Sequence, residues 1–166
     1  MSIASTLLPE FDHEMGTTRR LLERVPEAAF EWKPHEKSMS LGQLADHLSN
    51  LTGWANLIAT STTFDITSVG EDRKPKIPAS RNAMLARFDE KVAAARAELV
   101  SKTDAELVAS WTLKSGTHEV FTMPRISAIR SFVLNHTIHH RGQLSVYLRL
   151  KDVPLPSIYG PTADEP

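Results

Sequence analysis

The chain has 166 residues, of which 41% are hydrophobic and 23% charged, and its formal net charge is −1 at pH 7. This length predicts one domain, residues 1–166, with a core of its own, and the near-neutral charge argues against nucleic acid or an anionic membrane as a partner. The sequence has no cysteine, which excludes disulfides, thiolate ligands and a cysteine nucleophile. Acidic residues come too early for a signal-peptide core, and no apolar run reaches the ~18 residues of a membrane span, so we expect a cytoplasmic protein.

The first half of the chain predicts two amphipathic helices and a long loop. Apolar residues recur at helical spacing over 7–25, and Pro26 ends this helix. A second such series covers 41–58, with Ser38 or Ser40 as its N-cap. The segment 63–80 then contains a glycine, two prolines and a charge cluster, which indicates a crossover loop.

The second half predicts two more long helices. Ser80 can cap a helix whose apolar residues run over 84–99, and TDAE at 103–106 has the spacing of a capping box. SWTLKSGTHEVFTMP alternates around a Ser-Gly turn, which indicates a small hairpin. A fourth helix should cover about 124–150. Four long helices without a strong sheet signal predict an all-α protein, a four-helix bundle with a long crossover loop between its second and third helices.

Three of the seven histidines lie in the segment NHTIHHRGQL of the last helix. At about 100° per residue, His136 and His140 share a face with Ile129, so we expect this HxxxH pair to face the core, with His139 at the edge. Burying an imidazole without a partner costs about 1–3 kcal/mol, whereas one divalent cation can coordinate a neutral nitrogen of each ring. The pair therefore favours a metal site. The alternative is that these histidines only pack, in a dimeric scaffold.

A third ligand is needed to hold a metal firmly, and His47 in LGQLADHLSNL is the candidate. Its position at the edge of the apolar stripe of the second helix favours this role less strongly than spacing favours the pair. The remaining histidines, His13, His35 and His118, are expected at the surface.

Three segments resemble the DinB/YfiT family of small metal-binding helical bundles: MSLGQLADHLSNLTGW, NHTIHHRGQLSVYLRL and VPLPSIYGP. The similarity extends over nearly the whole chain. It implies a bundle of up-down-down-up topology, usually dimeric, with metal ligands at His47, His136 and His140. Relatives include bacillithiol or glutathione S-transferases and a mycothiol-dependent maleylpyruvate isomerase. The resemblance therefore implies a low-molecular-weight thiol as cosubstrate and a small-molecule substrate.

Three neutral imidazoles would leave a divalent ion with open coordination positions, as in catalytic zinc sites, and zinc and nickel both suit such a site. The first hypothesis is a metal-dependent enzyme, a thiol S-transferase or a hydrolase, in which the ion activates a thiol or water towards a small electrophile. The second is a dimeric bundle that binds a metal or a small molecule without turnover. A metalloprotease is not expected, because Thr137 stands where the HExxH motif has glutamate.

The sequence assigns no catalytic acid or base, but three polar residues lie near the predicted ligands. Gln143 lies on the histidine face and could bind a ligand nitrogen or a bound water, or it could tie helices together. Asn50 and Asn135 could orient ligands.

Other polar residues have simpler interpretations. Glu14 lies off the apolar stripe of the first helix, so it is a weak acid candidate and is expected at the surface. Arg141 also lies off its stripe, which predicts a salt bridge or a dimer contact. Gly142 could permit close approach of a neighbouring helix. Cations of the crossover loop form a solvated charge run or bind the carboxylates of a thiol; they are Arg73, Lys74 and Lys76.

Overall fold

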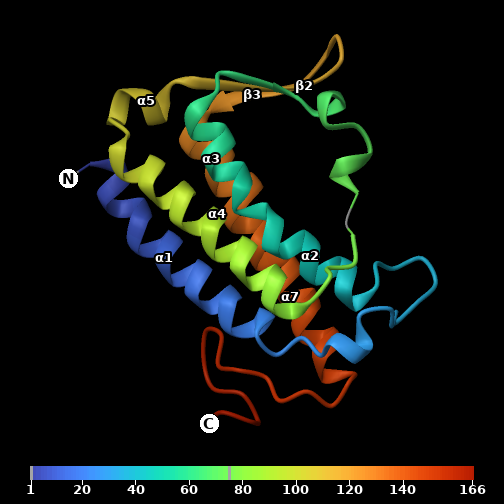
Figure 1. Cartoon of the computed structure of the whole chain (residues 1–166). Helices are drawn as coiled ribbons and strands as arrows, with labels where there is room; N and C mark the ends of the chain where they lie inside the picture. Colours follow the sequence, from blue (N-terminus) through green and yellow to red (C-terminus); the bar gives the residue numbers. More distant parts are fainter. Residues whose placement is uncertain (1, 75) are drawn as a thin grey trace.

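The computed structural model describes residues 2–74 and 76–166, without the side chains of 71–73. The chain is mostly helical, as predicted, and its long helices lie side by side (Figure 1). These helices are α1 (Ile3–Leu22), α2 (Leu41–Leu51), α3 (Gly53–Thr60), α4 (Arg81–Ser101) and α7 (His136–Arg149). α1 packs against α4 and α7, and α2 contacts the same two helices.

Side-chain caps fix where several helices begin. Ser40, not Ser38, caps α2, and it forms a full capping box with Gln43. Ser80 caps α4, as predicted. The TDAE segment forms the predicted capping box at the start of the short helix α5 (Asp104–Val108). The predicted second helix is two helices, because Thr52 separates α2 from α3.

A small sheet lies at one end of the helices (Figure 1). The predicted hairpin is confirmed as β2 (Ser110–Ser115) and β3 (His118–Pro124), which pair antiparallel. β1 (Thr63–Asp65) pairs parallel with β2, so the described residues contain a three-stranded sheet and the all-α prediction is wrong in this respect. Three residues are too few to show alternation, and β1 is a strand through its pairing with β2. Short 3-10 turns, η2 (Ile66–Arg73), follow it within the predicted loop.

The last long helix contains a π-helical segment. α6 (Arg125–Ala128) leads into η3 (Ile129–Asn135), a π-helix, and then into α7. A π turn holds more residues than an α turn and so rotates the helix faces. The buried face of η3 and α7 therefore contains Ile129, Val133, Leu134, Thr137, Arg141, Leu144 and Leu148.

This rotation corrects the expectation that the histidine pair faces the core. His136 and His140 are half-buried at the side of the buried face, because an angle of 100° per residue does not apply through η3.

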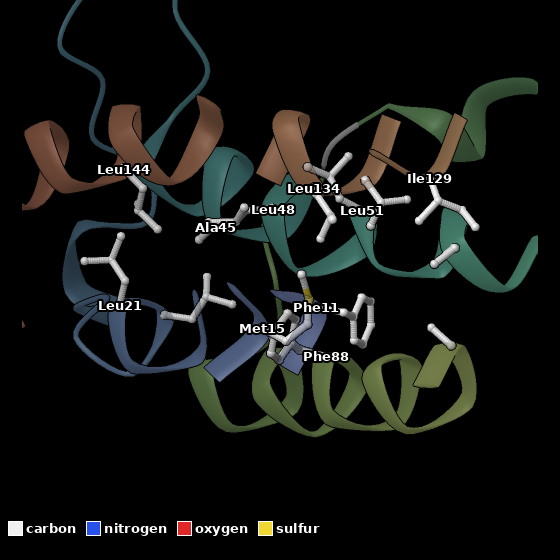
Figure 2. Close-up of a cluster of buried hydrophobic side chains, with 14 of the residues drawn as sticks. Phe11, Met15, Leu21, Ala45, Leu48, Leu51, Phe88, Ile129, Leu134 and Leu144 are labelled. Atoms are coloured by element: carbon white, nitrogen blue, oxygen red, sulfur yellow. The ribbon is translucent and has the colours of Figure 1, made fainter. Parts of the chain in front are cut away.

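Apolar side chains from all the long helices fill the space between them (Figure 2). Phe11 and Met15 of α1 meet Leu48 of α2 and Phe88 of α4, and all four side chains are at most 2% exposed. In the described part of the chain, no helix is long and apolar enough to cross a membrane.

A buried ion pair ties α1 to α7 and corrects the expectation that Glu14 is exposed. Arg141 Nη2 lies 2.6 Å from Glu14 Oε2, and the two side chains are 1% and 7% exposed. The Tyr159 hydroxyl, from the C-terminal tail, lies 2.9 Å from both carboxylate oxygens. Arg141 therefore forms a salt bridge, one of its two predicted roles. Gly142 is exposed with no described atom within 4 Å of its Cβ position, so no neighbouring helix approaches closely there.

Candidate metal centre

Three histidines from distant parts of the sequence meet between α2 and α7. His47 Nε2 lies 3.4 Å from His136 Nε2, which in turn lies 2.9 Å from His140 Nε2. One ring nitrogen from each of the three lies within 4.8 Å of the others, and all three residues are half-buried. The fold thus brings together the triad that the resemblance implied, in a geometry compatible with a metal site.

Two of the three nitrogen separations fit ligands of one divalent ion. With metal–nitrogen distances of about 2.0–2.1 Å and angles of about 90–109° at the metal, two ligand nitrogens lie about 2.8–3.4 Å apart. The separations from His136 Nε2 to His47 Nε2 and to His140 Nε2, 3.4 and 2.9 Å, lie in that interval.

A hydrogen bond on the far side of the His140 ring directs its Nε2 lone pair towards the other histidines. His140 Nδ1 lies 2.7 Å from the amide oxygen of Gln143, so this ring nitrogen carries the proton and Nε2 keeps its lone pair. The Nε2 atom of His136 faces the other two histidines. One cation can accept a lone pair from each of two imidazole nitrogens at the 2.9 Å separation of His136 and His140.

Gln143 and His139 act outside the triad. The Gln143 amide nitrogen lies 3.1 Å from His139 Nε2, so the amide bridges His139 and His140. Gln143 therefore hydrogen-bonds a ring nitrogen of His140, a candidate ligand. His139 is exposed and does not join the triad.

The three imidazoles are held in their neutral form. Burial is the largest cause of a lowered pKa at each, and it brings the pKa of His47 to about 4, with further lowering by His140 and His136. The pKa values of His136 and His140 are lowered mainly by burial as well. Neutral imidazole is the form that binds metal, so the rings are ready to coordinate at pH 7.

A cavity of about 750 Å³ lies beside the triad, and His47 and His136 both line it. Trp54, Phe64 and Phe132 form an apolar wall. Residues of the crossover loop complete the lining, including Lys74 and Lys76. The side chain of Arg73, also named as a cation of this loop, lies outside the described residues.

Four polar side chains line the cavity beside His47: Asp46, Asn50, Arg87 and Lys91. Buried Asp46 forms an ion pair with Arg87 of α4 and accepts hydrogen bonds from Asn50 and from the backbone N–H of Lys76. Lys91, one turn beyond Arg87, contacts the Asn50 side chain. Asn50 therefore contacts charged residues, with no hydrogen bond to the histidines among the described residues.

Sequence reasoning missed Asp46, Arg87 and Lys91. The available signals were the adjacency of Asp46 to His47 and the i, i+4 spacing of the two cations beside the apolar face of their helix. The other named residues lie away from the centre: His13, His35, His118 and Asn135 are exposed.

The protein is thus a small helical protein in which three histidines from two helices form a candidate metal site. The chain belongs to the DinB family, whose sequence profile matches residues 1–166, and this confirms the family resemblance.

Relatives and solved structures agree with this assignment. The chain is 25% identical to the uncharacterized protein YrdA of Bacillus subtilis, over 95% of this chain and 89% of YrdA. It is also 25% identical to the uncharacterized protein YjoA of the same organism, over 90% of this chain and 91% of YjoA. A crystal structure of a DinB-like protein from Bacillus cereus has a TM-score of 0.71 at 20% identity, covering 95% of this chain and 98% of that one. The crystal structure of YjoA has a TM-score of 0.69 at 18% identity, covering 95% and 99%.

Proposed function

We propose that the protein is a metal-dependent enzyme that holds one divalent transition metal, zinc or nickel, through Nε2 of His47, His136 and His140. The observation that carries this proposal is the convergence of three neutral imidazoles at ligand spacing beside a cavity. When bound, such an ion has open positions and acts as a Lewis acid that lowers the pKa of a thiol or of water.

The residues around the triad supply the remaining requirements of such a site. Gln143 accepts a hydrogen bond from His140 Nδ1 and so favours the tautomer with a lone pair on Nε2, and Trp54, Phe64 and Phe132 offer an apolar surface to a substrate. The chain has no cysteine, so a sulfur nucleophile must come from a cosubstrate. We propose transfer of a low-molecular-weight thiol, or of water, to a small electrophile.

One observation favours a second function, binding without turnover. Among the described residues that line the cavity, Asp46 is the only carboxylate, and its oxygens are engaged by Arg87, Asn50 and Lys76. A free general base is therefore missing from the described lining. A bundle that binds a metal or a small molecule would need none.

Metal content and turnover separate these functions. Tag-free protein purified without chelators should contain about one equivalent of metal by mass spectrometry, and His47→Ala, His136→Ala and His140→Ala should lose it. His139→Ala is the matched control and should keep it.

Thiol consumption with glutathione or bacillithiol and 1-chloro-2,4-dinitrobenzene, with zinc or nickel restored, then tests turnover. Metal-dependent consumption supports the enzyme, and metal binding without turnover of thiol or ester substrates supports the second function. If wild-type protein binds no metal, the metal-dependent enzyme and the metal-binding bundle are both contradicted.

The family resemblance leads us to propose the assembly as well. We propose a cytoplasmic homodimer with up-down-down-up helix order that acts on a small molecule and binds neither nucleic acid nor membrane. Light scattering coupled to size-exclusion chromatography tests the dimer: a mass of twice 18.5 kDa supports it, and a monomer contradicts it.

A further inference from the structure

The cavity beside the triad has an aromatic side, formed by Trp54, Phe64 and Phe132. The Trp54 ring contacts Phe64 edge-to-face, with centroids 5.4 Å apart, and also lies 6.0 Å from Phe132. These rings come from α3, β1 and η3, so the cavity lies where several elements meet. A wall of this kind stabilises an aromatic or branched apolar group by removing its surface from water.

The cavity lining also contains two cations of α4, Arg87 and Lys91. Arg87 is paired with Asp46. Lys91 contacts the neutral amide of Asn50, and it makes no ion pair within the described part of the chain. The Lys91 side chain lies across Gly53, with its Cδ 3.5 Å from the position of a Cβ there, so it is directed along the cavity lining.

This charge is partly removed from water. Lys91 is half-buried, and burial together with repulsion by Arg87 lowers its pKa. A desolvated ammonium group gains most from an anionic partner. Arg87 offers a second donor to an anion. Its Nη2 donates to Asp46 and Ser49, while its Nη1 makes no hydrogen bond to a described residue.

We propose that the cavity binds a small organic monoanion, a carboxylate with an aromatic or branched apolar body. The carboxylate binds Lys91 and Arg87, and the body lies against Trp54, Phe64 and Phe132. The far end of the molecule reaches His47 and His136, which line the same cavity. One negative charge matches Lys91, which makes no ion pair within the described part of the chain. The position of the far end rests on the proposed metal function, whereas binding of the carboxylate does not need the metal.

Isothermal titration calorimetry with 3-phenylpropanoate and its neutral isostere 3-phenylpropanamide tests this assignment. We expect the acid to bind wild-type protein, both metal-free and zinc-loaded, about ten-fold or more tightly than the amide, because a charge-assisted hydrogen bond is lost with the charge. Lys91→Gln should weaken binding of the acid by about ten-fold or more, while Lys91→Arg keeps it within about three-fold.

The control is Lys33→Gln, which removes the same charge from an exposed loop and should leave binding unchanged. Equal binding of acid and amide, equal binding by Lys91→Gln and Lys33→Gln, or no saturable binding of the acid overturns the inference. Because the metal-free protein is measured as well, failure of the metal site leaves the test of the anion site intact.

Discussion

Two polar clusters on α7 differ in how completely they are paired. Arg141 meets a carboxylate, a hydroxyl and a backbone carbonyl, all supplied by the protein. On a neighbouring face of the same helix, Nε2 of His136 and of His140 meet each other, and His136 Nε2 also meets Nε2 of His47, so these nitrogens contact only imidazole among the described residues. A cluster whose charges and hydrogen bonds are complete holds the fold together. A cluster in which three imidazoles converge has the geometry to bind a metal ion from outside the chain.

The largest effect is expected in the complete cluster. Arg141→Met should lower the free energy of unfolding by about 3–5 kcal/mol, because it leaves the buried Glu14 carboxylate without its cation. Urea unfolding followed by circular dichroism measures this loss. The double variant Glu14→Leu/Arg141→Met should be less destabilised than Arg141→Met alone. A double variant destabilised by the sum of both single losses would contradict pairing between the two residues.

At neutral pH, metal binding at the incomplete cluster should stabilise the protein. Zinc at about 100 times its Kd should raise the free energy of unfolding by about 2.7 kcal/mol, which for this length corresponds to a Tm increase of about 5–10 °C. Differential scanning calorimetry should show this increase for wild type and for His139→Ala. His136→Ala should show none. An equal increase in His136→Ala would place the bound zinc elsewhere.

Gln143 should tune the site without forming it. Gln143→Leu removes the acceptor for His140 Nδ1, and loss of such an outer hydrogen bond weakens metal affinity by about 10–100-fold. Gln143→Glu keeps an acceptor and should retain affinity better. Competition with a chromophoric chelator measures both variants. Wild-type affinity in Gln143→Leu would show that the ring needs no such support.

The smallest effect is the response of the metal-free protein to acid. His47 has a pKa of about 4 in the folded protein and 6.5 as its reference value, so between these values the unfolded chain binds a proton that the folded chain does not. Stability from this residue is therefore complete above about pH 6.5 and is lost as the pH falls towards 4. Urea unfolding at pH 7, 6, 5 and 4.5 should show a weaker pH dependence for His47→Leu than for wild type. An identical dependence would contradict the depressed pKa.

Much of the helical fold could be predicted because its signals are local. Caps at Ser40, Ser80 and Thr103 and periodic apolar residues depend on near neighbours in sequence. β1 could not be predicted, since its pairing with β2 spans distant segments. No sequence pattern predicted the π-helical turns of η3. These turns rotate the helix, so His136 and His140 lie beside its buried face and not on it.

The candidate site divides in the same way. Spacing alone placed His136 and His140 together, and family resemblance rather than periodicity added His47. Glu14 was expected at the surface because charge normally indicates exposure, and only the tertiary contact with Arg141 explains its burial. Arg87 and Lys91 reach the cavity through the packing of α4 near α2 and α3, which no local pattern encodes.

Titration of the metal-free protein with cobalt(II), followed by visible absorption, tests the central claim most directly. Bands that saturate at one equivalent in wild type, and that are lost in His47→Ala, His136→Ala and His140→Ala but not in His139→Ala, are the predicted result. The absence of saturable bands in wild type, or bands that persist in all three ligand variants, would contradict a three-histidine metal centre.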